Sequence, residues 1–179
     1  MAEPIDFREA WDHTEVRVVS PNEQVFITVR GNREVEVGVD PGYYGRATRD
    51  QLETQLARAA RLAFIERTRA FLDLRGRERG SPLRQGRTIH SREDTEYFRR
   101  LDELAVEGES DDGQARVSAV GMTHFTVSIA PSVLERLDPA EFCRIASQAA
   151  TRLLEDQLRK GKELRYDVYM RPLVERHLA

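Results

Sequence analysis

Two long stretches of this chain align with each other at a constant offset of ninety residues and without a gap. Residues 14–74 and 104–164 carry the same amino acid at 11 of 61 aligned positions, against roughly 4 expected from average composition. Gly31 aligns with Gly121, and Pro41 aligns with Pro131. The offset predicts two copies of one small structural unit; convergence of two unrelated β-β-α units is the alternative.

The matching glycines and prolines separate runs in which apolar residues alternate with polar ones. Alternation with a period of two is typical of strands that bury one face. A glycine tolerates the positive φ of a tight turn, and a proline cannot continue a strand ladder. The predicted strands occupy residues 14–20, 24–30 and 34–40 in the first copy, and residues 105–110, 114–120 and 123–129 in the second.

Apolar residues with helical spacing follow the last strand of each copy. Polar residues of the kind that cap helix N-termini predict three helix starts, at Thr48, Ser91 and Asp138. Glycines predict the ends of the two long helices, at Gly76 and Gly161. Residues 1–13 are expected to form a short helical turn or an arm packed on the body.

These elements predict an α+β protein of two β-β-β-α units. Each unit has an antiparallel three-stranded sheet packed by long helices, and a pseudo-twofold axis relates the two. The predicted divisions are a first unit at residues 1–75, an Arg/Gly-rich linker at 76–90, a second unit at 91–164 and a packed C-terminal tail at 165–179. Such a linker reaches about 20 Å even as a compact coil, which allows pairing within one chain or between two.

Composition limits the compartment and the class of protein. The chain has one cysteine, Cys143, and therefore no internal disulfide. No apolar run approaches the 18 or so residues that span a membrane, and the N-terminus lacks the apolar core of a signal peptide. We therefore expect a cytoplasmic protein with no membrane partner.

The second copy resembles the YbaB/EbfC family of small bacterial nucleoid-associated proteins. The resemblance rests on VEGESDDGQARVSAVG (106–121), FTVSIAPSVLERLDPAEF (125–142) and the alanine-rich helix SQAATRLLEDQLRK (147–160). The first copy keeps ITVRG (27–31) and VEVGVDP (35–41). Members of this family are small α/β homodimers that bind DNA with little sequence preference, and some actinobacterial relatives accompany type VII secretion systems. The resemblance implies the same fold in each copy and a nucleoid-associated function.

The chain departs from the family pattern in two ways. It carries two units in one chain, so the repeat can supply a pseudo-dimer within one molecule. It also has PNEQ (21–24) in the first copy, where the second copy has an acidic turn that contains glycine. Because the net charge is −3, any attraction to DNA must come from one part of the surface.

Positive charge is concentrated between residues 58 and 92. This segment has three carboxylates and a net charge of +7, which leaves −10 for the rest of the chain. Arginine suits phosphate because its planar fork holds two oxygens at once, and such contacts do not read the base sequence. We therefore expect sequence-independent binding of double-stranded DNA by ten arginines: Arg58, Arg61, Arg67, Arg69, Arg75, Arg77, Arg79, Arg84, Arg87 and Arg92.

Other interpretations stay open. Arginines on the solvated face of a helix need no ligand, and the acidic remainder favours a protein-interaction or chaperone-like module, with type VII secretion as one setting. A homodimer also stays open. An enzyme, a cofactor or a metal is not expected, because no nucleotide-binding or nucleophile motif is present and the histidines share no ligand spacing. These histidines are His13, His90, His124 and His177.

Overall fold

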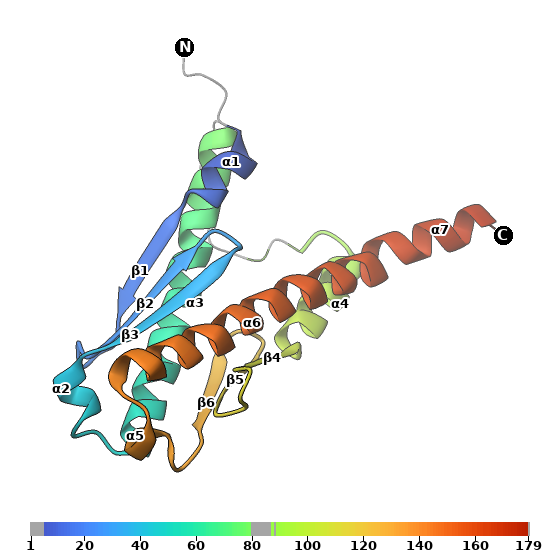
Figure 1. The fold of residues 1–179 in the computed structure, drawn as a ribbon. Helices are drawn as coiled ribbons and strands as arrows, with labels where there is room; N and C mark the ends of the chain where they lie inside the picture. Colours follow the sequence, from blue (N-terminus) through green and yellow to red (C-terminus); the bar gives the residue numbers. More distant parts are fainter. Residues whose placement is uncertain (1–5, 80–86, 88, 179) are drawn as a thin grey trace.

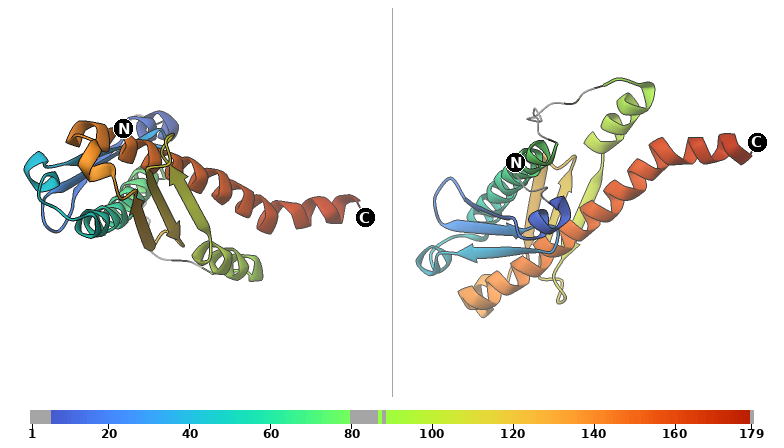
Figure 2. Two further views of the ribbon diagram at one scale, coloured as in Figure 1. Left: turned by 60° about the horizontal axis from the view of Figure 1, so that its bottom comes forward. Right: turned by 90° about the horizontal axis from the view of Figure 1, so that it is seen from above.

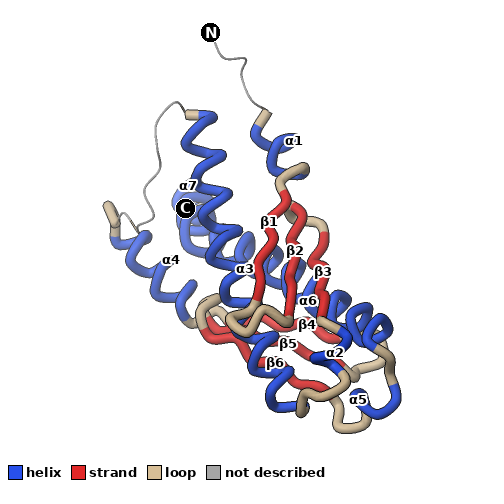
Figure 3. Tube along the Cα trace, turned by 90° about the vertical axis from the view of Figure 1, so that its left-hand side faces the viewer, coloured by secondary structure: helices blue, strands red, loops and turns tan. Residues whose placement is uncertain are grey.

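The computed structural model describes residues 6–79, 87 and 89–178. The first half contains α1 (Phe7–Asp12), β1 (Glu15–Val19), β2 (Val25–Arg30), β3 (Glu34–Val39), α2 (Pro41–Tyr44) and α3 (Arg49–Glu78). The second half contains α4 (Arg92–Asp102), β4 (Ala105–Glu109), β5 (Ala115–Val120), β6 (His124–Ile129), α5 (Val133–Arg136), α6 (Pro139–Arg165), the π-helical segment η1 (Tyr166–Met170) and α7 (Arg171–Leu178). Two antiparallel three-stranded sheets, each leading into a long helix, confirm the predicted α+β class (Figures 1 and 3).

The two sheets repeat each other residue by residue. Val16 faces Val29 in the first sheet, and Val106 faces Ala119 ninety positions later in the second. The same offset relates the pairing of β2 with β3 to the pairing of β5 with β6. An identical register in both sheets confirms the strand predictions and the presence of two copies of one unit.

The turn that follows the first strand of each copy has one geometry despite two sequences. Ser20 and Ser110 are both buried, and each hydroxyl accepts a hydrogen bond from the N–H that opens the next strand, at 3.0 Å. The left-handed position of the turn is filled by Gly113, with φ of 69°, and by Glu23, with φ of 60°. The PNEQ segment therefore forms the same turn as the second copy, although glutamate seldom adopts a left-handed backbone conformation.

The two units pair within the chain, because each long helix covers the outer edge of the other unit's sheet. Figure 1 shows α6 crossing beside β3. Val37 N–H donates to Ser147 Oγ at 2.8 Å, and Val35 N–H donates to Thr151 Oγ1 at 3.0 Å. On the β6 side, Glu53 of α3 accepts the N–H of the last strand residue at 2.8 Å. Helix side chains thus satisfy backbone groups that edge strands leave unpaired.

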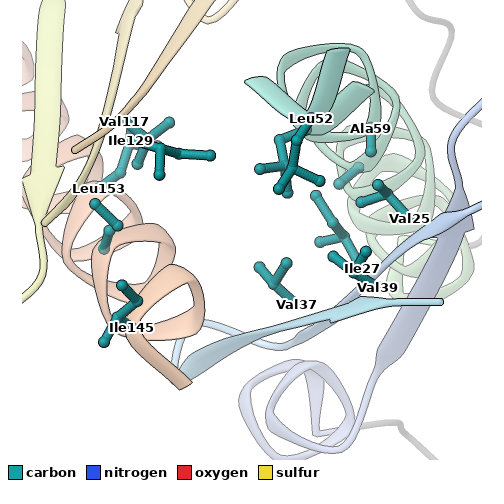
Figure 4. Close-up of a cluster of buried hydrophobic side chains, with 14 of the residues drawn as sticks. Val25, Ile27, Val37, Val39, Leu52, Ala59, Val117, Ile129, Ile145 and Leu153 are labelled. Atoms are coloured by element: carbon teal, nitrogen blue, oxygen red, sulfur yellow. The ribbon is translucent and has the colours of Figure 1, made fainter. Parts of the chain in front are cut away.

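One hydrophobic core joins the two halves. Val25, Ile27 and Leu52 of the first half belong to the same buried cluster as Phe142 and Ile145 of the second. Figure 4 shows side chains of both halves facing a common interior. Separating the halves would expose this apolar surface to water, which is unfavourable in proportion to the area exposed.

Both long helices run past the glycines that predicted their ends. Gly76 is buried inside α3, which ends at Glu78, and Gly161 lies inside α6, which continues through η1 into α7. Those predicted ends were wrong, because a glycine inside a helix costs only about 1 kcal/mol and tertiary packing exceeds that. Pro172 lacks the N–H that would bond four residues back, which accounts for the irregular turn at η1.

A short helix precedes the sheet in each copy and packs on a long helix. Trp11 of α1 is buried, and its ring lies 5.2 Å from that of Phe71 on α3 in a T-shaped arrangement. In the second copy, Tyr97 of α4 lies 5.4 Å from Tyr169 of η1. The expected N-terminal helical turn is therefore present, and both long helices carry an aromatic contact near their C-terminal ends.

Gly108 in β4 allows α6 to lie directly on the second sheet. A Cβ atom here would overlap with the Ala149 carbonyl oxygen and the Leu153 backbone nitrogen. The counterpart of Gly108 in β1 is Val18, so α3 cannot approach the first sheet as closely at this point. The two halves share a topology and differ in how tightly helix and sheet meet.

We expect Gly108→Ala to lower the free energy of unfolding by about 3 kcal/mol, because backbone atoms surround the added methyl group. Gly161→Ala is the matched control. Its glycine has open space around it, so this change should raise the free energy of unfolding by about 1 kcal/mol through helix propensity. Denaturant unfolding measures both, and equal effects would contradict the close approach of α6.

We expect Ser147→Ala to lower the free energy of unfolding by about 1–3 kcal/mol, because the buried Val37 N–H loses its acceptor. The repeat supplies the reverse experiment. Ala57 is the counterpart of Ser147 and has no acceptor to offer β6. Ala57→Ser should therefore stabilise the protein by about 1 kcal/mol. An unchanged midpoint for Ser147→Ala would show that the edge contact contributes nothing.

Candidate nucleic-acid interface

The ten predicted arginines do not form one uniform surface. Six lie on α3, Arg79 follows its last residue, Arg87 precedes α4, and Arg92 is the first residue of α4. Arg84 lies outside the described residues. The nine described side chains divide into those bonded within the chain and those without an ion pair to any described residue.

Arg67 ties α3 to the turn between β2 and β3. Its Nε donates to the Gly31 carbonyl oxygen at 3.3 Å, its Nη2 donates to Asn32 Oδ1, and its guanidinium lies 5.3 Å from the Trp11 ring centroid. Burial lowers the pKa of Arg67 to about 10, which still leaves it charged at neutral pH. The sequence carries a signal for this structural role. Arg67 follows the buried Ala63 by four residues and therefore lies on the same face of α3.

Two more arginines on α3 are engaged by carboxylates of the same helix. Arg69 Nη1 lies 2.6 Å from Glu66 Oε1, and Arg75 Nη1 lies 2.7 Å from Glu78 Oε2. The Arg75 guanidinium also lies 3.6 Å from the centroid of the Phe7 ring. Both cations are partly neutralised before any ligand approaches.

Arg87 is paired with α4. It donates to both carboxylate oxygens of Asp102, one of them at 2.6 Å, and its guanidinium lies 5.0 Å from the Phe98 ring centroid. The hydrogen bonds to Asp102 raise the pKa of Arg87, and they lower the pKa of the Asp102 carboxyl. Arg87 thereby fastens the chain ahead of α4 to that helix.

The remaining five arginines have exposed side chains and no ion pair to any residue within 6–79, 87 and 89–178. This free arginine set comprises Arg58, Arg61, Arg77, Arg79 and Arg92. Arg58 and Arg61 are three residues apart and share one face of α3. Arg77 and Arg79 lie at the other end of α3, and this end of the helix is beside α1 (Figure 1). At 1.5 Å per residue, about 31 Å of helix separates Arg58 from Arg79.

The second half does not repeat this charge. The counterparts of Arg58, Arg61, Arg77 and Arg79 are Gln148, Thr151, Asp167 and Tyr169. Arg159, the counterpart of Arg69, is held by Asp156 at 2.5 Å and by Glu163 at 2.9 Å. The free arginines at the end and in the middle of α3 therefore have no basic counterparts in the second half.

A small apolar cavity lies where the two halves meet. Repeat-related residues line it in pairs, among them Ile27 with Val117, Val35 with Phe125, and Ala60 with Ala150. Its volume is about 70 Å³, whereas an engineered cavity of about 150 Å³ is known to hold benzene. This space is a packing gap on the pseudo-twofold axis and is too small for an organic cofactor.

The described residues contain no group of three or more His, Cys, Asp or Glu side chains that could hold a metal ion. Cys143 is half-buried, and burial raises the pKa of its thiol, the opposite of the lowering that a helix N-terminus can produce. His124 is exposed. These two side chains therefore offer no activated nucleophile or ligand set.

The C-terminal tail is only partly packed, which differs from the expectation for residues 165–179. Val168 is buried, but Tyr166, Met170 and Val174 are 51%, 49% and 44% exposed. Their spacing of four residues is visible in the sequence and would have marked one face of a helix.

We expect Arg67→Ala to lower the free energy of unfolding by about 2 kcal/mol, because the turn at Gly31 and Asn32 loses hydrogen bonds from a charged donor. Arg61→Ala, on the outer side of the same helix, should leave unfolding unchanged. Thermal denaturation of the two variants separates structural from surface arginines. Equal stability of both would contradict the role assigned to Arg67.

None of the helices in the part of the chain that the structure describes has the length and apolar composition to cross a bilayer. Comparison with protein-family models, with curated proteins and with solved structures finds no match to this chain. The resemblance to the YbaB/EbfC family therefore rests on the sequence motifs alone.

Proposed function

We propose that this protein binds double-stranded DNA with little sequence preference, through exposed arginines of α3. The observation that carries the proposal is the free arginine set, whose side chains are exposed and have no ion pair among the described residues. Four of its five members lie on α3 or directly after it, and the fifth, Arg92, begins α4. An arginine without a carboxylate partner keeps its full attraction for a phosphate oxygen. Arg67, Arg69, Arg75 and Arg87 are bonded within the chain, so the proposal does not rely on them.

The contacts would be to the DNA backbone. The long separation along α3 lets Arg58 and Arg61 reach phosphates well apart from those reached by Arg77 and Arg79. Each neutralised phosphate releases counterions, so affinity falls with salt. The four free arginines of α3 and its C-terminal end predict a slope of log affinity against log salt no steeper than about −3.6. The acidic second half would face away from the duplex, and the setting would be the bacterial nucleoid in the cytoplasm.

A gel-shift titration on a random duplex across a salt series tests the proposal. We expect binding at low salt, and we expect Arg58→Glu or Arg61→Glu to weaken it on every sequence and to reduce the salt slope by at least about 1. Arg144→Glu is the matched control, because Arg144 is an exposed arginine on α6 and its reversal changes the net charge equally.

Two outcomes would end this proposal. One is the absence of binding at low salt. The other is an equal loss of affinity in Arg144→Glu, which would show that only net charge matters and that α3 carries no site.

A protein-interaction or chaperone-like module is the second candidate, and the charge distribution favours it. Four of the nine described arginines are already bonded within the chain, and residues outside 58–92 carry a net charge of −10. This acidic remainder repels DNA and suits a basic protein partner. Recovery of one defined protein in a stable complex, with no affinity for DNA, would favour this candidate.

A further inference from the structure

The C-terminal helix extends beyond the repeat and carries apolar side chains on its open side. Figure 2 shows this end projecting away from the sheets. The last residue of α3, Glu78, has Val168 as its counterpart, so α7 ends ten residues further along than the first copy does. Tyr166, Met170 and Val174 follow one another at intervals of four and are each about half exposed. We call this row the C-terminal stripe.

The opposite side of the same helix is fixed to the body. Val168 is buried, Tyr169 OH donates to Asp94 Oδ1 at 2.8 Å, and Arg100 lies 3.6 Å from Asp167. Tyr169 also packs on an α4 ring, as described above. The C-terminal stripe is therefore held in one orientation, and a partner that docks on it pays little ordering entropy.

We propose that the C-terminal stripe binds the same stripe of a second copy of this chain, with the two helices antiparallel and a twofold axis at Met170. A twofold interface requires a patch that is complementary to itself. In the antiparallel arrangement the Met170 side chains meet at the axis, and Tyr166 of each copy meets Val174 of the other. Asp167 and Arg171 lie on one flank of Met170 and form an ion pair with each other at 2.7 Å. In the antiparallel arrangement the same ion pair of the second copy lies beside it, with each charge next to the opposite charge of the other chain.

The charges of this segment favour a second copy over a lipid surface or a nucleic acid. Residues 163–174 contain Glu163, Arg165, Asp167 and Arg171, and their net charge is zero. A helix that lies on a membrane is rich in Lys and Arg on its polar face, and a DNA contact also needs excess positive charge. A segment that balances both signs does not repel its own copy.

The patch is small, which sets the strength of the association. A few half-exposed side chains per copy bury less than the roughly 1,200 Å² at the lower limit of standard interfaces. We therefore expect a weak, reversible dimer that forms as protein concentration rises from micromolar toward millimolar.

Sedimentation velocity of the full chain over this concentration range tests the proposal. The mass should rise from one chain toward two, and Met170→Lys should keep the protein monomeric, because two ammonium groups would meet at the axis. Val120→Lys is the matched control, since Val120 is 46% exposed at the end of β5, outside the C-terminal stripe. This variant should dimerise like the parent.

Cross-linking gives a second readout that does not depend on affinity. Under mild oxidation Met170→Cys should form a disulfide between chains, whereas Val120→Cys should not. A protein that stays monomeric throughout, a Met170→Lys variant that still dimerises, or a stripe that binds phosphatidylserine vesicles while the protein stays monomeric would overturn the proposal. These results do not depend on whether the protein binds DNA.

Discussion

Coverage of two sheet edges is the constraint on which the rest of this structure depends. A three-stranded sheet leaves a row of unpaired N–H and C=O groups on each outer strand, and such rows recruit other strands. Here β3 is covered by α6 and β6 is covered by α3, so neither half is complete alone. The contacts of Val35 and Val37 with Thr151 and Ser147 fix α6 across the first sheet, and this crossing brings the two apolar faces into one core.

Within this twofold frame the two halves have different surfaces. Free arginines lie on α3 and directly after it, whereas the counterpart positions in α6 and η1 carry neutral or acidic residues. The interior differs as well. Arg67 is hydrogen bonded to the turn at Gly31, but its counterpart Gln157 has a buried Oε1 with no hydrogen-bond partner among the described residues. The second helix then continues into an exposed apolar stripe that the first half lacks.

The sequence was sufficient for the strands and for the starts of α3, α4 and α6, because these depend on local signals. Alternation places the strands, and the residues at Thr48, Ser91 and Asp138 cap their helices as their side-chain chemistry predicts. The ends of the long helices were not predictable from glycine, since tertiary packing carries α3 past Gly76 and α6 past Gly161. The sequence could not show which of the ten predicted arginines are bonded within the chain and which are free. The partners of Arg87 and Arg67 come from other elements, so only the folded structure brings them together. Whether that site binds DNA stays a prediction.

Joining the two units in one chain affects how far their sequences can diverge. A homodimer of small subunits comes apart on dilution, whereas two units tethered by a short segment remain at an effective concentration near millimolar however scarce the protein is. In a homodimer every substitution also appears on both sides of the axis. A fused pair is free of that duplication, so one half can lose charge, tighten a helix on its sheet as Gly108 does, or gain an extra helix, while the other half keeps what the pairing requires.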